Sequence, residues 1–121
     1  MPETILTIDD DELIRELIEH HLVSAGYRVV TAENGLNGVA LAVSEDVDLV
    51  LCDLGLPDLS GVDVVSTLKA RNVAAPVVIV SGMVDNRMHE ELNAAGAAAY
   101  IIKPFMRQDL LSVVEKTLSG N

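Results

Sequence analysis

The sequence has very few aromatic residues and a single cysteine. Its 121 residues include two tyrosines, one phenylalanine and no tryptophan, although half of them are hydrophobic. The core must therefore be built from aliphatic side chains. One cysteine excludes an internal disulfide, which is consistent with a reducing compartment, and we expect a cytoplasmic protein.

Basic residues are also scarce. The chain carries 8 lysines and arginines against 19 aspartates and glutamates, a formal net charge of −11. This balance argues against direct nucleic-acid binding, which needs a basic surface, and against attraction to an anionic membrane. No apolar run approaches the roughly 20 residues of a membrane span. The stretch before Asp9 lacks the basic start of a signal peptide.

Short apolar runs alternate with helical patterns along the whole chain. We expect strands at residues 5–8, 28–32, 49–52, 77–80 and 100–102, each followed by a helix. Strict alternation of this kind predicts a parallel sheet with helices on both faces. The more polar start of 28–32 favours an edge strand. At this length we expect one domain spanning residues 1–121.

Two helical stripes make specific predictions about burial. In the first helix the apolar residues are Leu13, Ile14, Leu17, Ile18 and Leu22. In the second they are Leu36, Val39, Ala40 and Val43. Both spacings place the apolar residues on one side of a helix, so we expect these side chains to face the sheet.

A polar side chain stands at the end of most of the apolar runs. These residues are Asp9, Asp10, Asp53, Ser81 and Lys103. The carboxyl ends of parallel strands meet at one edge of a sheet, where open α/β folds place their chemistry. Three carboxylates together repel one another and need a cation, and hard oxygen ligands suit Mg²⁺. With a lysine and a hydroxyl nearby to bind phosphoryl oxygens, Asp53 is equipped to accept a phosphoryl group as an acyl phosphate.

At these residues the sequence resembles the receiver domains of two-component response regulators. The resemblance covers essentially the whole chain. Its motifs are Ile8-Asp9-Asp10, Asp53 with Leu56-Pro57-Asp58 and Gly61, Ser81, Tyr100, and Lys103-Pro104-Phe105. It implies a flavodoxin-like, doubly wound α/β fold with five helices and five strands in the order 2-1-3-4-5.

The resemblance also implies a role for each site residue. Asp53 is expected to be the phosphoacceptor, with Lys103 and Ser81 binding the phosphoryl group. Asp10, Asp53 and the Gly55 carbonyl are expected to bind Mg²⁺ directly, and Asp9 through water. Ser81 and Tyr100 are expected to move as the switch, and the Lys103–Pro104 bond is expected to be cis.

The same resemblance implies a signalling switch rather than an enzyme. Its partners would be a sensor histidine kinase or a histidine phosphotransfer protein, and an output domain or protein contacting the last two helices and the last strand. A phosphorylation-dependent homodimer is a further expectation. The chain end leaves open a standalone regulator, a transcription factor or a hybrid kinase, and the closeness of Met1 to the first strand favours the first two.

The chain departs from the family pattern beside the expected phosphoacceptor. Gly55 offers no side chain two residues after Asp53, and Met83, two after Ser81, is apolar. Both positions lie over the site in the family, where they tune the access of water. The other distinctive residues have structural interpretations: Cys52 as a core thiol, Asp58 as a loop residue, and His20, His21 and His89 as solvated or structural.

Two other classes of function compete with the signalling switch. The run Ile8-Asp9-Asp10-Asp11 also matches the start of haloacid-dehalogenase-like phosphatases, in which Asp9 would be the nucleophile. Those proteins carry a further acidic motif after the lysine, and this chain has no acidic pair there. A phosphorylation-independent interaction module on the same fold is the third class.

Overall fold

The computed structural model describes residues 2–120 and shows one parallel five-stranded sheet in the order β2-β1-β3-β4-β5. The strands are β1 (Thr4–Ile8), β2 (Arg28–Ala32), β3 (Leu49–Asp53), β4 (Val77–Ser81) and β5 (Ala99–Ile102). The helices are α1 (Glu12–Ser24), α2 (Gly35–Ser44), α3 (Gly61–Ala70), α4 (Asn86–Ala95) and α5 (Arg107–Leu118). The predicted fold class, strand order and edge position of residues 28–32 are confirmed. Met1 and Asn121, the ends of the expected domain, lie outside the described residues.

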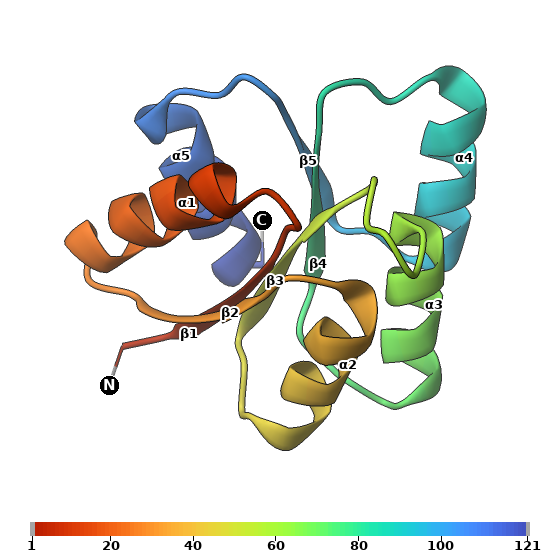
Figure 1. Ribbon diagram of the computed structural model, residues 1–121, viewed down its shortest axis with the longest axis horizontal. Helices are drawn as coiled ribbons and strands as arrows, with labels where there is room; N and C mark the ends of the chain where they lie inside the picture. The colour runs from red at the N-terminus through yellow and green to blue at the C-terminus, as the bar shows by residue number, and fades with distance from the viewer. Residues whose placement is uncertain (1, 121) are drawn as a thin grey trace.

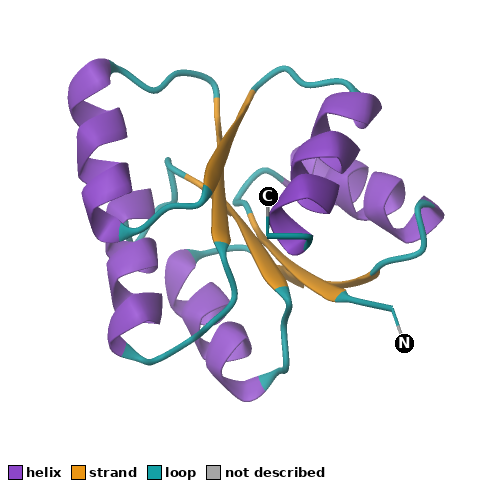
Figure 2. Ribbon diagram, turned by 180° about the vertical axis from the view of Figure 1, so that it is seen from behind, coloured by secondary structure: helices purple, strands orange, loops and turns teal. Residues whose placement is uncertain are grey.

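The helices form a layer on each face of the sheet (Figures 1 and 2). Helices α1 and α5 pack on one face, and α2, α3 and α4 pack on the other. Side chains alternate along a strand, so Leu51 points into the α1–α5 layer and Cys52 into the opposite layer. Burial on both sides explains why β3 and β4 are continuous apolar runs rather than alternating ones.

Helix α2 approaches the sheet through glycine and alanine rather than through its large apolar residues. Its buried positions are Gly35, Gly38, Val39 and Ala42. A Cβ on Gly38 would lie 2.4 Å from Ile8 Cδ1, so only glycine allows α2 to pack this close to β1. The expected stripe is therefore wrong in part. Leu36, Ala40 and Val43 are exposed because the helix turns its small residues toward the sheet.

Helix α1 also buries less of its apolar surface than its pattern predicts. Ile18 and Leu22 are buried and Ile14 is partly buried, but Leu13 is 76% exposed and Leu17 is 41% exposed. The stripe is wider than the contact that α1 makes with the sheet and α5. None of the helices formed by residues 2–120 has the length and apolar character needed to span a lipid bilayer.

Candidate functional site

The predicted site residues meet at the carboxyl edge of the sheet. Asp53 ends β3, and Asp9 follows directly after Ile8, which pairs with Cys52, so the two carboxylates stand on neighbouring strands at the same level. Lys103 comes from beyond β5 and reaches both of them. Its Nζ lies 3.1 Å from Asp9 Oδ2 and 3.2 Å from Asp53 Oδ1. The Lys103 ammonium group thus binds two carboxylates that lie 94 and 50 positions earlier in the chain.

The backbone around Lys103 fixes the direction of its side chain. The Lys103 N–H donates to the Ser81 carbonyl at 2.8 Å, which continues the pairing of β5 with β4. The peptide bond between Lys103 and Pro104 is cis, as the resemblance implied. Lys103 therefore leaves the sheet at the point where its side chain can cross β4 and reach β3 and β1.

Both carboxylate oxygens of Asp9 accept hydrogen bonds. Its side chain is 2% exposed, its Oδ1 accepts from the Asp11 N–H at 2.9 Å, and its Oδ2 accepts from Lys103. Its main-chain carbonyl accepts from Arg15 Nη1 at 2.7 Å. Because both carboxylate oxygens have donors, Asp9 is held in place and is suited to bind a metal through water rather than directly.

Asp10 and Asp53 have the free oxygens that a metal needs. Oxygens of Asp9, Asp10 and Asp53 lie within 4.8 Å of one another. Among residues 2–120, Asp10 has no hydrogen-bond partner, and Asp53 Oδ2 has none either. Carboxylates of this number and spacing, open to solvent on the Asp10 side, fit Mg²⁺, which keeps several waters and takes one or two carboxylates. The donor set therefore fits the ion that the family implies.

The charges at this edge perturb both members of the central ion pair. Burial raises the pKa of Asp53. The Lys103 charge opposes this shift, whereas the Asp9 and Asp10 carboxylates raise the pKa further. Burial alone would lower the pKa of Lys103, but its hydrogen bonds and charge contacts with Asp9 and Asp53 together raise it. The lysine faces two carboxylates, whereas Asp53 faces one ammonium and two like charges. The site keeps Lys103 charged and leaves Asp53 short of positive charge.

The surroundings of Asp53 are open on two sides. A Cβ on Gly55 would meet only Asp53 Oδ2, at 3.8 Å, so a side chain there would lie against the carboxylate. Gly82 has no atom within 4 Å of its Cβ position, and Met83 is 78% exposed. Ser81 is buried at the end of β4, and its hydroxyl donates to the Met83 carbonyl at 3.2 Å. No side chain at residues 55 or 82 covers the Asp53 carboxylate.

Tyr100 lies beneath α4 in a polar contact that the sequence did not predict. Its hydroxyl donates to Asn93 Oδ1, and its ring is 4.5 Å from the His89 ring, centre to centre. Asn93 Nδ2 and His89 Nδ1 are 3.3 Å apart. Because residues 89 and 93 are one helical turn apart, they present both side chains to the same part of β5. The spacing of residues 89 and 93 was the one sequence feature that pointed to this contact.

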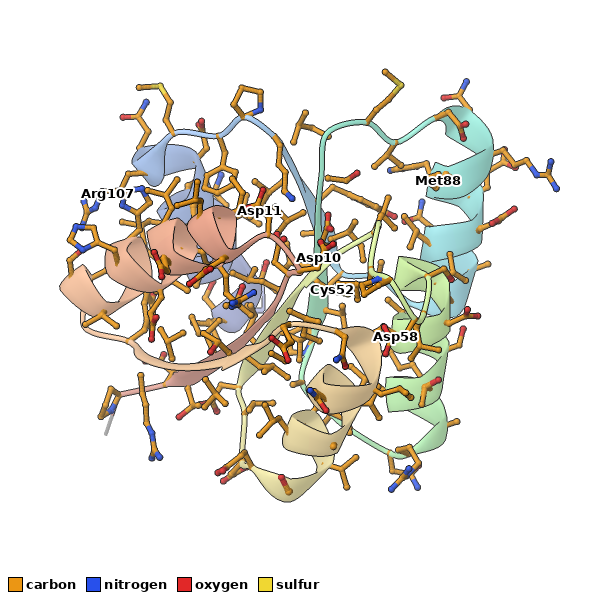
Figure 3. The ribbon with its side chains drawn as sticks, in the orientation of Figure 1. Asp10, Asp11, Cys52, Asp58, Met88 and Arg107 are labelled. Atoms are coloured by element: carbon orange, nitrogen blue, oxygen red, sulfur yellow. The ribbon has the colours of Figure 1, made fainter. Side chains whose placement is uncertain are left out.

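Two further residues have roles that sequence patterns alone could not assign. Arg15 binds the main chain of Asp9, as described above, and Asp58 binds the start of α2. Asp58 Oδ1 accepts from the Gly35 N–H at 2.8 Å, and Oδ2 accepts from the Leu36 N–H at 2.9 Å. The hydrogen bonds from Leu36 and Gly35 lower the pKa of Asp58. Figure 3 labels Asp58 near the start of α2 and Asp10 at the site.

Cys52, His20 and His21 lie outside the group of predicted site residues, whereas His89 contacts Tyr100. Cys52 is fully buried behind Asp53, and burial raises the pKa of its thiol. His20 and His21 lie on α1, with ring centroids 5.9 Å apart. His21 is partly buried, and its Nδ1 has no hydrogen-bond partner within the described part of the chain. Burial, Arg107 and His20 lower its pKa.

Comparison with known proteins identifies the family. Residues 5–115 match the response regulator receiver domain. The chain is 38% identical over 108 residues to the cell cycle transcriptional regulator CtrA of Caulobacter vibrioides, covering 89% of this chain and 47% of that protein. It is 34% identical over 117 residues to the transcriptional regulatory protein KdpE of Mycobacterium tuberculosis, covering 97% and 51%. The chain thus spans about half the length of these relatives.

Solved structures show the same fold. A chemotaxis response regulator of Vibrio cholerae superposes with a TM-score of 0.91 at 26% identity, covering 97% of this chain and 99% of that one. The receiver domain of a sensor histidine kinase from Pseudomonas aeruginosa, with a magnesium ion coordinated in its active site cleft, gives 0.90 at 26% identity, covering 98% and 99%. With the matched residues and the strand order, these comparisons show that the chain belongs to the receiver domain family of response regulators.

Proposed function

We propose that this chain is a phosphoacceptor switch of a two-component system, acting as one receiver domain over residues 1–121. The observation that carries the proposal is the Lys103 ammonium held between Asp9 and Asp53, at 3.1 and 3.2 Å. A cation in this position can bind a phosphoryl oxygen as soon as Asp53 becomes phosphorylated. The partner would be a sensor histidine kinase or a histidine phosphotransfer protein.

The proposed reaction transfers a phosphoryl group from phosphohistidine to Asp53. A carboxylate oxygen of Asp53 forms the new P–O bond while the P–N bond breaks, and the imidazole nitrogen keeps the electron pair and takes up a proton. Lys103 and the Ser81 hydroxyl bind phosphoryl oxygens. Hydrolysis later breaks the P–O bond by attack of water on phosphorus, which returns Asp53 and releases inorganic phosphate.

The metal ligands proposed are Asp10, Asp53 and the Gly55 carbonyl directly, with Asp9 through water. Their free and engaged oxygens support this division, since Asp10 is open and Asp9 is not. When bound, Mg²⁺ supplies positive charge that offsets repulsion between the carboxylates and the phosphoryl oxygens. Asp9 also orients Lys103, so a second task for Asp9 is to place the ammonium group.

The proposed output is a change at α4, β5 and α5. Ser81 would move toward the phosphoryl oxygen, and the segment after it would follow, which would free Tyr100 to change from its contact with Asn93 to a buried position. A partner protein, an output domain or a second copy of the chain would then bind this altered surface.

The test is to map the phosphorylated residue. We expect a small-molecule phosphodonor to add one phosphoryl group by intact mass, only when a divalent cation is present. Borohydride reduction of the acyl phosphate, followed by peptide mapping, should place the modification at Asp53, and Asp53→Asn should take up none. Modification at Asp9 would instead support the haloacid-dehalogenase-like phosphatase, and no modification at all would support the phosphorylation-independent interaction module.

A further inference from the structure

The loop between β3 and α3 is tied to the start of α2 by one carboxylate. Asp58 accepts hydrogen bonds from the backbone N–H groups of Gly35 and Leu36, which lie 23 and 22 residues earlier in the chain. It also accepts from the Leu59 N–H at 2.9 Å. Because the first N–H groups of a helix have no partner within the helix, Asp58 supplies acceptors that α2 lacks.

The packing around this contact is too close for any residue but glycine at position 35. A Cβ on Gly35 would lie 2.8 Å from Leu59 Cβ and 3.1 Å from Asp58 Oδ1. The contact therefore depends on close packing as well as on hydrogen bonds. Asn34 separately caps α2 by accepting from the Asn37 N–H at 2.8 Å, so the helix has a local cap besides Asp58.

Gly55, in the same loop, makes no hydrogen bond to any other residue in the described range 2–120. It is exposed and has no side chain, and glycine loses more conformational freedom on ordering than any other residue. The proposed metal ligand at this position is a main-chain carbonyl, whose direction depends on the backbone alone. The neighbouring anchors are Asp53 at the end of β3, the buried Leu56, and Asp58.

We propose that Asp58 is a positioning residue for metal binding: by fastening the β3–α3 loop to the first turn of α2, it orients the Gly55 carbonyl toward the Mg²⁺ position. The inference rests on the proposed function, because the ligand role of Gly55 belongs to it. Residues that orient metal ligands without touching the metal typically change its affinity by 10- to 100-fold when they are removed. Asp58 would act in this way through the backbone.

The experiment measures Mg²⁺ affinity and loop mobility in the same set of folded proteins. Calorimetric titration with MgCl₂ at about 0.15 M salt, which limits long-range charge effects, gives the dissociation constant. Amide hydrogen exchange without metal reports the order of the 54–59 segment and of the first turn of α2. The variants are Asp58→Ala, which removes all the acceptors, and Asp58→Asn, which keeps one oxygen and replaces the other with an amide.

Two control variants separate positioning from other effects. Asn34→Ala removes the local cap of α2 and leaves Asp58 in place, so it tests whether a weaker helix is enough. Glu33→Gln removes one negative charge beside α2 from a side chain that makes no hydrogen bond among residues 2–120, so it tests whether lost charge is enough.

We expect Asp58→Ala to raise the Mg²⁺ dissociation constant by roughly tenfold. It should also speed amide exchange at Gly35, Leu36 and Leu59, whose N–H groups donate to Asp58, with Asp58→Asn between it and wild type. Both controls should stay within about twofold of wild type, although Asn34→Ala should melt lower. If folded Asp58→Asn and Asp58→Ala bind Mg²⁺ as tightly as wild type, this inference is overturned but the proposed function is not. An equal loss of Mg²⁺ affinity in either control has the same consequence. A wild-type protein that binds no Mg²⁺ overturns the proposed function and this inference with it.

Discussion

The two loops that flank Asp53 differ in how they are anchored. The β3–α3 loop is fastened at three points: Leu56 is buried, Asp58 binds α2, and Ser60 caps α3 in a capping box that also includes Asp63. The β4–α4 loop has fewer anchors: Val84 packs against the core, and the Ser81 hydroxyl is hydrogen-bonded to the Met83 main chain. Gly82 has open space around it, Met83 is 78% exposed, and Asp85 caps the helix that follows.

The helices after these loops differ in the same sense. Helix α3 buries Gly61, Val64, Val65 and Leu68, whereas α4 buries only Leu92 among its described residues. Buried apolar area is what holds a helix on a sheet, so α4 is the helix that can shift at the lowest cost. Under the proposed function, the better-anchored side would present a metal ligand, and the side with fewer contacts would move when Asp53 changes its charge.

The largest difference in stability should appear when one methyl group is added beside each of the two loops. A Cβ on Gly61 would lie 2.4 Å from Leu54 Cδ2 and 3.3 Å from Leu54 Cα. We expect Gly61→Ala to lower the free energy of unfolding by about 1–3 kcal/mol through overpacking, measured by urea denaturation. Gly82→Ala meets no atom within 4 Å and should change it by less than about 0.5 kcal/mol. Equal losses in the two variants would contradict the contrast between the loops.

Magnesium binding at the β3–α3 side should raise the free energy of unfolding by a somewhat smaller amount. At tenfold excess over the dissociation constant, binding contributes about 1.4 kcal/mol. Asp10→Asn removes a charge that raises the pKa of Asp53 and thereby destabilises charged Asp53 in the fold. The variant should therefore melt higher than wild type in chelator, yet gain much less from Mg²⁺, in thermal melts with and without metal. A lower melting temperature in chelator would show that Asp10 does not crowd the site.

The mobile side should respond to the loss of one hydrogen bond. Asn93→Ala removes the acceptor of the Tyr100 hydroxyl, worth about 1 kcal/mol. We expect the position of Tyr100 in which its hydroxyl bonds to Asn93 to lose population by roughly fivefold relative to the proposed buried position. Fluorotyrosine NMR can follow this, because the chain has two tyrosines and hence two signals. Asn86→Ala, at the start of the same helix, is the control, and an identical response there would rule out a specific contact.

The smallest effect concerns acid. The pKa of Asp58 is lowered by hydrogen bonds from Leu36 and Gly35, so its ionised form stabilises the fold above the unfolded-state pKa, and this contribution is lost as pH falls through the folded-state pKa. The difference in melting temperature between wild type and Asp58→Asn should therefore be constant near neutrality and shrink below about pH 4. A difference that does not change between pH 7 and pH 3 would mean that the Asp58 charge plays no part in the contact.

The features predictable from sequence were those that depend on neighbours along the chain. Apolar runs ending at Asp9, Asp53 and Ser81 placed the strands, and the geometry of parallel sheets then brought their ends together. The resemblance supplied the strand order. Its expectation for the Lys103–Pro104 bond was also met.

The contacts that sequence missed join residues from different helices, strands and loops. The α2 stripe was misjudged because Gly38 faces Ile8, and a glycine carries no apolar signal of its own. Asp58 looked like an ordinary turn residue because its partners lie 22 and 23 residues earlier. The Tyr100 contact likewise depends on how α4 lies over β5. Patterns record which faces are apolar, whereas these contacts depend on how closely two elements approach.

The position of Cys52 makes the protein convenient for labelling. It is the only cysteine in the chain, it is fully buried, and its pKa is raised, so little of it is the reactive thiolate at neutral pH. A second cysteine placed on the surface, such as Met83→Cys in the β4–α4 loop, where the native side chain is exposed, would react alone with a thiol-specific dye. The movement of that loop could then be recorded in the otherwise native chain, without first replacing the residue next to Asp53.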